Sequence, residues 1–537
     1  MEFPPLKYAP IKPHKMTPMK RWQSMILVLP LFLGACAEKA KNIEETLQVE
    51  SGLISGLKDP GSGVISFKGI PFAAPPVGDL RWKAPQPAEA WEGIRQCTDF
   101  GPSPMQAAPA PFMFWSEEFL IPEEPIGEDC LYLNVWTRAG TEADQLPVLV
   151  YIYGGGFRSG GSGCPIYDGS AMAEKGVVFV SFNYRVGVFG FLAHPELTAE
   201  SGYGSSGNYA LLDMVAALEW VQRNIARFGG DPGNVTIAGQ SAGSFAVNFL
   251  TASPLAKGLF HRAIAQSGAS FVSSPLRPEM TLTGAEQLGL AFGEGVGAAS
   301  LAALRSLPAD SILRARGGMN APFVDGHVLP ESVMEAYRHG HQNDVPVIAG
   351  WNKDDRVMGR TQPADRFLEQ VQSRFGDLAE ACLEVYPAGS EQEAVRSQLD
   401  MSRDESFGIQ GYMWAKVQSA AEKSPIYLYN FHRALPAHTP ETQFGAFHTG
   451  EVVYAYDNLH TLDRPWEAVD QQIASLMSSY WVNFARSGDP NGPGLPRWEA
   501  YGPEQEQAMI IDTLSTLKIL PDLDQLKFWE RYYTRGE

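Results

Sequence analysis

Apolar residues fall along this chain in short runs that alternate with longer segments of helical spacing. A continuous apolar run occupies residues 148–153, and short, mostly apolar runs occupy 177–182, 345–350 and 426–431. Runs of this kind are typical of parallel strands that are buried on both faces. Residues 128–136 instead alternate apolar and polar side chains, which also predicts a strand.

Helical spacing predicts one helix over residues 208–228 and a long amphipathic helix over 466–487. The sequence Gly-Gly-Asp-Pro at 229–232 ends the first helix, and a new strand begins at 235–238. Because strands alternate with helices, we expect an α/β fold with a large, mostly parallel central sheet flanked by helices. Residues 101–126 are rich in proline and aromatic residues and predict a long irregular loop insertion.

The composition is that of a globular chain with one large core. Apolar residues make up 44% of the 537 residues and charged residues 19%. Length alone suggests several domains, but large α/β enzymes extend a single sheet, so we expect one domain over 48–537. The net charge of −19 argues against nucleic acid as a partner.

The N-terminus has the pattern of a targeting segment. Basic residues precede an apolar run at 25–33, which is too short to span a bilayer because a spanning helix needs about 20 residues. Residues 33–36 then read Leu-Gly-Ala-Cys, which resembles a bacterial lipobox. The resemblance implies a signal peptide over 1–35, acylation of Cys36 and a polar tether over 36–47.

This interpretation predicts an exported lipoprotein of the cell envelope that touches the membrane only through its N-terminal lipid. The alternative is that Ala35-Cys36-Ala37 is an ordinary signal-peptidase site, which would give a secreted or periplasmic soluble protein.

Residues 239–243 read Gly-Gln-Ser-Ala-Gly and follow a β-branched run. A G-x-S-x-G sequence between a strand and a helix is typical of a nucleophile elbow, in which a sharp turn exposes the serine hydroxyl. Ser241 is therefore the candidate nucleophile. The alternative for this short motif is a plain Gly/Ser turn in a loop.

Three glycines, Gly154, Gly155 and Gly156, follow the predicted strand 148–153. A phosphate-binding loop is disfavoured because no Gly-Lys-Ser/Thr follows them. The glycines instead leave backbone N–H groups open to a substrate oxygen. Together with the N–H of Ala242 they would form an oxyanion hole.

A serine nucleophile needs a base and an orienting acid. His448 lies in a loop shortly after the predicted strand 426–431, and Asp354 and Asp355 follow the predicted strand 345–350. Such loops are where an α/β-hydrolase places these groups. His339 and His341 form an H-x-H pair, which we interpret as a helix end because the sequence shows no third metal ligand nearby.

These segments together resemble the type-B carboxylesterases, the cholinesterase-like branch of the α/β-hydrolases. The similarity runs from about residue 48 to the end. The similar segments are 69–82, 128–136, 153–157, 183–191, 207–237 and 484–491. The resemblance implies that Ser241 is the nucleophile, His448 the base and Asp355 the acid. It also implies that Gly155, Gly156 and Ala242 donate to the oxyanion.

The sequence departs from the family pattern at three places. Gln240 stands where the family usually has glutamate, and Asp355 stands where the acid is usually glutamate, which keeps Asp354 as an alternative. The family often has a disulfide in this part of the chain, and here a Cys97–Cys130 bridge is a possibility.

The resulting prediction is a serine carboxylic-ester hydrolase that acts on small-molecule esters through an acyl-enzyme and needs no metal or organic cofactor. Alternatives are an amide, carbamate or lactone hydrolase with the same triad, or a catalytically silent binding module. We expect the 101–126 insertion and residues 356–366 to shape the substrate pocket.

Overall fold

The structure is a computed structural model that describes residues 41–537, apart from residues 275–277, 357–359, 422 and 536–537. The predicted signal peptide, Cys36 and the first part of the predicted tether lie outside the described residues. Among the helices that are described, none has the length and apolar character needed to cross a membrane.

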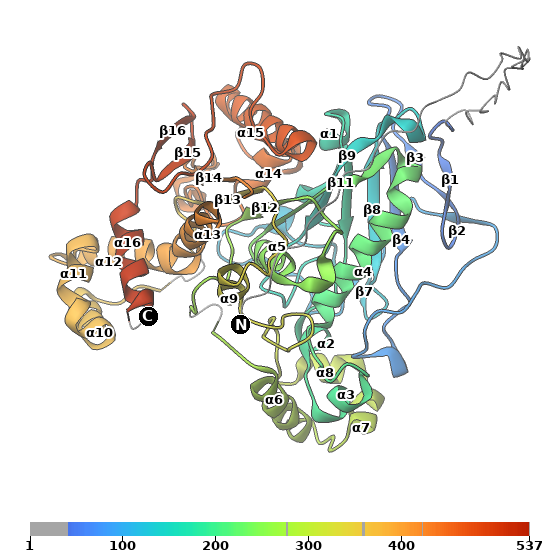
Figure 1. Cartoon of the computed structure of the whole chain (residues 1–537), viewed down its shortest axis with the longest axis horizontal. Coiled ribbons are helices and arrows are strands. Elements are labelled where there is room, and N and C mark those ends of the chain that lie inside the picture. Colours follow the sequence, from blue (N-terminus) through green and yellow to red (C-terminus); the bar gives the residue numbers. More distant parts are fainter. Residues whose placement is uncertain (1–40, 275–277, 357–359, 422, 536–537) are drawn as a thin grey trace, which may run out of the picture. The chain divides into compact units, whose positions relative to one another are not determined.

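A large sheet runs through the described chain, with the strand order β16-β15-β14-β13-β12-β11-β9-β10-β8-β4-β3 (Figure 1). In that order the strands are Thr516–Ile519, Gln507–Ile511, Ile426–Phe431, Val347–Asn352, Arg262–Gln266, Gly230–Gln240, Leu146–Ile152, Val178–Phe182, Tyr132–Thr137, Ile65–Pro71 and Leu57–Lys58. Neighbours from β15 to β10 pair in parallel, and the outer strands pair antiparallel. The predicted α/β-hydrolase architecture is confirmed.

Two small sheets lie outside this main sheet. One joins β1 (Thr46–Val49), β2 (Gly52–Ser55) and β5 (Ile94–Gln96), and the other joins β6 (Ser103–Pro104) and β7 (Ile126–Gly127).

Helices connect the strands and pack against the sheet. In chain order, α1 to α8 are Ser170–Glu174, Gly187–Phe191, Pro195–Glu200, Tyr209–Asn224, Ala242–Ala252, Leu282–Gly295, Leu301–Ser306 and Ala309–Arg314. Helices α9 to α16 are Val333–Arg338, Ala364–Phe375, Ala379–Val385, Glu391–Arg403, Ile409–Ala420, Val452–Ala455, Ala468–Ser487 and Leu523–Thr534. Helices α4, α5, α13 and α15 contact the parallel strands directly.

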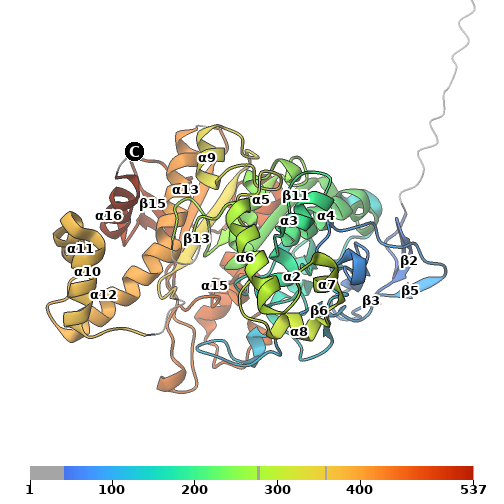
Figure 2. The ribbon, with the colours of Figure 1, turned by 90° about the horizontal axis from the view of Figure 1, so that it is seen from below.

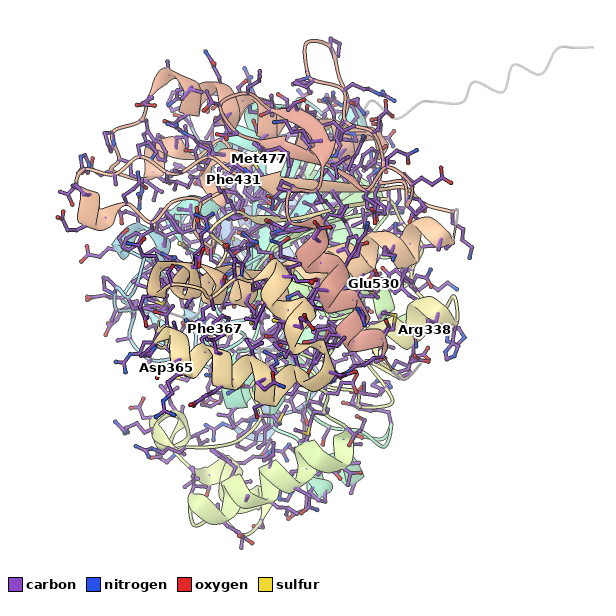
Figure 3. The ribbon with its side chains drawn as sticks, turned by 90° about the vertical axis from the view of Figure 1, so that its left-hand side faces the viewer. Arg338, Asp365, Phe367, Phe431, Met477 and Glu530 are labelled. Carbon is purple, nitrogen blue, oxygen red and sulfur yellow. The ribbon has the colours of Figure 1, made fainter. Side chains whose placement is uncertain are left out.

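Helices α10, α11, α12 and α16 lie together at the end of the domain opposite β2 and β5 (Figure 2). Helix α10 is amphipathic, with Phe367, Val371 and Phe375 on its buried face. Asp365, two residues before Phe367, is exposed (Figure 3). This spacing of apolar residues explains why a segment of low mean hydropathy still forms a packed helix.

The parallel strands place the candidate residues at one edge of the sheet. Gly239 of β11 lies opposite Ile152 of β9, and Gln240 lies opposite Gln266 of β12. Asn352 of β13 lies opposite Phe431 of β14. The loops after β9, β11, β13 and β14 therefore all leave from the carboxyl ends of neighbouring strands, which is where α/β sheets carry their sites.

The folded domain begins earlier than the sequence predicts. Residues 41–47, interpreted as part of a free tether, already pack on the domain. Ile43 and Leu47 are buried, and the N–H of Ile43 donates to the carbonyl of Gly140 at 3.0 Å. The predicted tether boundary at residue 47 is therefore wrong. Two apolar side chains within an otherwise polar stretch anchor residues 41–47 to the domain.

The possible Cys97–Cys130 disulfide is not formed. Both thiols are free and buried. Cys97 follows β5 and bonds through its backbone to Lys68 and Ser55, whereas Cys130 lies near the Arg185–Asp213 ion pair. The fold places the two cysteines in different surroundings, and a disulfide requires Cβ atoms only about 4 Å apart.

Candidate active site

Ser241 occupies a sharp turn between β11 and α5. Its backbone has φ 55° and ψ −123°, a conformation that residues other than glycine rarely adopt. Its N–H donates to the carbonyl of Gln266 at 2.8 Å. A Cβ at Gly243 would lie 1.9 Å from the carbonyl oxygen of Ile152, so only glycine fits at that position. The G-x-S-x-G sequence thus forms the strand, turn and helix expected of it.

The glycine loop after β9 lies beside this turn. Gly155 and Gly156 have φ of 114° and 65°, and a Cβ at Gly155 would lie 2.2 Å from the carbonyl oxygen of Ser159. Ala242 is the first residue of α5, where the helix offers no acceptor for its N–H. The glycine loop and the first turn of α5 therefore lie next to Ser241, since a Cβ at Gly154 would come within 3.0 Å of the Ser241 Cβ.

His448 and Asp355 are in direct contact. His448 Nδ1 lies 2.5 Å from Asp355 Oδ1, and the two side chains are 1% and 0% exposed. The second oxygen of Asp355 accepts from the N–H of Asn352 at 2.9 Å. The carboxylate is therefore held in one orientation, and a neutral imidazole that donates from Nδ1 to Asp355 has its acceptor lone pair on Nε2.

Asp354 has a different contact. Its Oδ2 accepts from the N–H of Ala446 at 2.8 Å, and its own N–H donates to the carbonyl of Ala446 at 3.1 Å. These bonds join the loop after β13 to the loop that carries His448. They bring the two loops close enough for the short Asp355 side chain to reach the imidazole, so of the two candidate acids the structure joins Asp355 to His448.

Gln240, the residue before Ser241, also reaches the imidazole. Its side-chain nitrogen lies 3.2 Å from His448 Nε2. Its oxygen accepts from the Thr449 hydroxyl at 3.4 Å, and that hydroxyl accepts from the Trp115 indole at 3.1 Å. With the proton on Nδ1, Nε2 is the acceptor for the Gln240 amide. A glutamate at this position has no such proton to donate when it is ionised.

A second buried carboxylate, Glu451, lies behind Asp355, and the sequence analysis missed it. Its oxygens accept from Asn352 Nδ2 at 2.5 Å and from Gln266 Nε2 at 3.2 Å. Burial, followed by the neighbouring charge of Asp355, raises the pKa of Glu451 to about 7. The only sequence signal was its position three residues after His448.

Aromatic rings enclose the imidazole. The Phe407 ring stacks on His448 at 4.8 Å between centroids, and the Trp115 ring meets it edge-on at 6.0 Å. Phe407 belongs to a π-helical turn, Asp404–Gly408, and such turns recur at functional sites.

A cavity of about 770 Å³ opens over this site. Its walls are the 106–121 part of the predicted insertion, the glycine loop, Ser241 and His448. The insertion therefore lines the cavity, as expected. The described members of 356–366 do not line it, which corrects that expectation, and residues 357–359 lie outside the described part of the chain.

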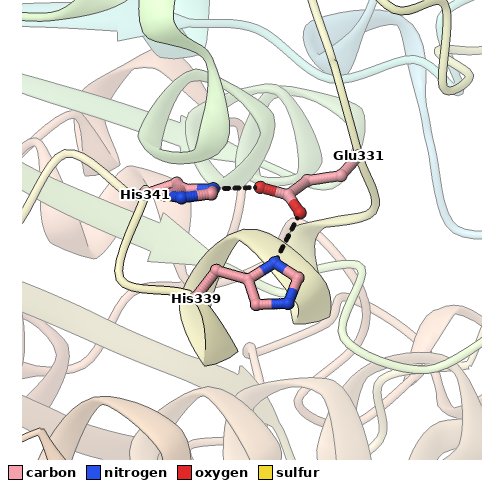
Figure 4. A group of neighbouring side chains, drawn as sticks. All are labelled: Glu331, His339 and His341. Atoms are coloured by element: carbon pink, nitrogen blue, oxygen red, sulfur yellow. Dashed lines mark hydrogen bonds and ion pairs between the residues drawn. The ribbon is translucent and has the colours of Figure 1, made fainter.

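The His339–His341 pair does have a third neighbour. Helix α9 ends at Arg338, as the helix-end interpretation expects, and His339 and His341 both contact Glu331 through Nδ1, at 2.8 and 2.6 Å (Figure 4). Glu331 lies eight residues before His339, so sequence spacing did not indicate it.

A family model described as the carboxylesterase family matches residues 43–529. The chain belongs to the carboxylesterase family. It is a type-B carboxylesterase with the α/β-hydrolase fold, and thus a carboxylic ester hydrolase, which confirms the resemblance and the enzyme class inferred from the sequence.

This carboxylesterase is similar over most of its length to characterised esterases. It is 36% identical to fumonisin B1 esterase of Sphingopyxis macrogoltabida, over 89% of this chain and 88% of that protein. It is 33% identical to para-nitrobenzyl esterase of Bacillus subtilis, over 90% and 97%. A solved Geobacillus stearothermophilus carboxylesterase covers 90% of this chain and 100% of its own, with TM-score 0.76 and 32% identity.

Proposed function

We propose that this carboxylesterase hydrolyses esters through Ser241, His448 and Asp355. The observation that carries the proposal is the contact between His448 Nδ1 and Asp355 Oδ1 beneath the cavity that Ser241 lines. In a Ser-His-Asp triad, that contact leaves Nε2 of the histidine ready to take the proton of the serine.

The first half of the reaction forms an acyl-enzyme. His448 Nε2 first exchanges its contact with the Gln240 amide for a hydrogen bond from the Ser241 hydroxyl. The Oγ of Ser241 then attacks the ester carbonyl carbon while its proton moves to His448 Nε2. The carbonyl oxygen becomes negative and accepts from the N–H groups of Gly155, Gly156 and Ala242. Each such donor typically contributes about 3 kcal/mol of transition-state stabilisation. The alcohol then leaves with the proton from His448.

The second half releases the acid. Water attacks the acyl carbon and gives its proton to His448 Nε2, the oxyanion forms again at the same N–H groups, and the Ser241–acyl bond breaks as His448 returns the proton to Oγ. Asp355 stays ionised throughout and stabilises the imidazolium.

The decisive experiment is hydrolysis of p-nitrophenyl acetate and butyrate by the purified protein and by Ser241→Ala. A fall of several orders of magnitude in the variant supports the proposal, and equal rates refute it. Labelling by a fluorophosphonate that is lost in Ser241→Ala identifies the reacting serine directly. Matched amide, carbamate and lactone substrates then test the alternative reactions.

The proposed location is the cell envelope, through acylation of Cys36. Radioactive palmitate should label the full chain in a bacterial host but not Cys36→Ser. Label retained by the variant refutes the anchor, and export without label favours a soluble periplasmic or secreted enzyme.

A further inference from the structure

Arg158 lies at the wall of the active-site cavity, two residues after Gly156. Its backbone N–H donates to the carbonyl of Gly155 at 3.0 Å. The turn of the glycine loop therefore also holds the backbone of Arg158 in place. Its side chain is exposed and lines the cavity.

The charge of Arg158 has a neutral partner. Its guanidinium donates to the side-chain oxygen of Asn320 at 3.3 Å, and turning that amide lets both Nε and Nη2 reach the oxygen, at 3.0 and 3.1 Å. Of the described residues that line the cavity, Arg158 alone carries a fixed charge. The chain as a whole has a net charge of −19, so a cation without an anionic partner in the cavity wall is the exception in this protein.

The remaining cavity wall is largely apolar. The insertion contributes Phe112, Trp115, Phe119 and Ile121 to it. A ligand with an apolar body and one terminal anion would match both features, because a guanidinium binds a carboxylate through two parallel N–H bonds and the apolar walls reduce competition from water.

We propose that Arg158 forms a carboxylate-binding subsite and that the enzyme prefers esters whose acyl or alcohol part carries a second, free carboxylate. This inference rests on the proposed reaction at Ser241. It predicts a substrate class, and it assigns Arg158 to substrate selection while leaving the bond-breaking steps to the triad.

Two pairs of esters that differ in one charge test the subsite. Mono-p-nitrophenyl adipate against p-nitrophenyl hexanoate probes the acyl side. The acetate ester of 4-hydroxybenzoate against that of its methyl ester probes the alcohol side. In Arg158→Gln, kcat/KM for the anionic member of at least one pair should fall about tenfold or more, and the neutral member should stay within about twofold. Arg158→Lys should recover part of the loss.

Arg314→Gln is the matched control, since Arg314 is exposed and does not line the cavity. Equal losses on charged and neutral esters, or no loss in Arg158→Gln, would overturn the subsite. If the wild type hydrolyses no ester, the proposed reaction fails, and the subsite is judged by calorimetric binding to Ser241→Ala. There 4-phenylbutyrate should bind more tightly than its neutral amide, and Arg158→Gln should abolish the difference. A difference that is absent or persists in Arg158→Gln overturns the proposal.

A second inference comes from a separate observation at the end of α9. Gly340 adopts φ 71°, and the N–H of His341 returns to the carbonyl of Ala336 at 2.8 Å. This is the Schellman ending of a helix, and it folds His341 back beside His339. Both imidazoles then point at the Glu331 carboxylate (Figure 4), and one ligand atom of each of the three residues lies within 4.8 Å of the others.

The geometry points to a binding site for a divalent transition metal such as Zn²⁺ or Ni²⁺. Two imidazole nitrogens and one carboxylate oxygen suit these ions and leave positions for water. The ion would replace the protons that now join each Nδ1 to Glu331. Because Tyr337 of α9 donates to Thr251 of α5 at 3.0 Å, the ion would stabilise the contact between α9 and the helix that begins after Ser241.

Untagged protein freed of metal by chelation should bind one Ni²⁺ in calorimetry and unfold at a higher temperature with Ni²⁺ present. His341→Ala and Glu331→Gln should lose both effects. His460→Ala, which changes an exposed histidine elsewhere, should keep both. Failure of the wild type to bind one ion, or binding that survives in His341→Ala, would overturn the site.

Discussion

Asp355 and Asp354 are adjacent carboxylates with separate contacts, and exchanging each for asparagine tests the proposed triad. Asp355→Asn removes the negative charge 2.5 Å from His448 Nδ1. The asparagine has one acceptor oxygen for two donors, His448 and the N–H of Asn352. Its NH₂ group would favour the imidazole with the proton on Nε2, where it cannot accept from Ser241.

The same change in a Ser-His-Asp triad lowers kcat about 10⁴-fold, so we expect a loss of about 10³- to 10⁴-fold here, equivalent to about 4 to 5.5 kcal/mol. Asp354→Asn can keep its bond from the Ala446 N–H through the amide oxygen. It should retain kcat/KM within a few-fold.

The assay is p-nitrophenyl butyrate hydrolysis at pH 8, with circular dichroism to confirm that both variants fold. A Ser241→Ala variant sets the background rate. The reasoning is refuted if Asp355→Asn keeps more than about a tenth of the wild-type kcat, or if Asp354→Asn is the slower of the two.

Gln240, Glu451 and Gly243 offer three further tests. Gln240→Glu replaces the amide beside His448 Nε2 with a carboxylate, which favours the protonated imidazole that cannot act as a base. The ratio of kcat/KM at pH 6 to kcat/KM at pH 8 should therefore fall several-fold, and an unchanged ratio contradicts this. Because the pKa of Glu451 rises to about 7 on folding, its stabilising contribution is present at pH 4.5 and lost by pH 7, on the order of 3 kcal/mol. Glu451→Gln should flatten the dependence of unfolding free energy on pH over that range, and an unchanged slope contradicts it. Gly243→Ala places a Cβ 1.9 Å from the Ile152 carbonyl oxygen and should lower the free energy of unfolding, measured in urea, by about 3 kcal/mol. An unchanged free energy of unfolding would contradict the close packing.

The sequence predicts best where a hydrophobic run and a turn signal coincide. The strand at 426–431 is found at those residues, and the G-x-S-x-G turn has the expected geometry, because both depend on local patterns. Strand β13 runs from Val347 to Asn352, two residues later than predicted. The pattern ends the strand too early because Gly350 and Asn352 are not typical strand residues, yet both are buried and Asn352 is hydrogen bonded to Glu451.

The missed parts of the site depend on contacts between distant segments. Glu451 is an ordinary acidic residue in the sequence, and only burial beside Asp355 gives it an altered pKa. Arg158 belongs to a glycine-rich loop, and the structure alone shows that it faces the cavity. The choice between Asp354 and Asp355 likewise needed the pairing of two loops, which no periodicity within one segment encodes.

The insertion that lines the cavity is one contiguous stretch, so natural variation there can change which substrates fit without altering any strand of the main sheet. That freedom stops at Trp115, whose indole donates to Thr449, the residue next to His448, and whose ring touches the imidazole. Broadening the acyl or alcohol range by mutation around Phe112 should therefore leave turnover of small esters intact. Mutation at Trp115 should instead lower kcat even where it widens the range of substrates accepted. Directed evolution of this enzyme should therefore keep Trp115 unchanged.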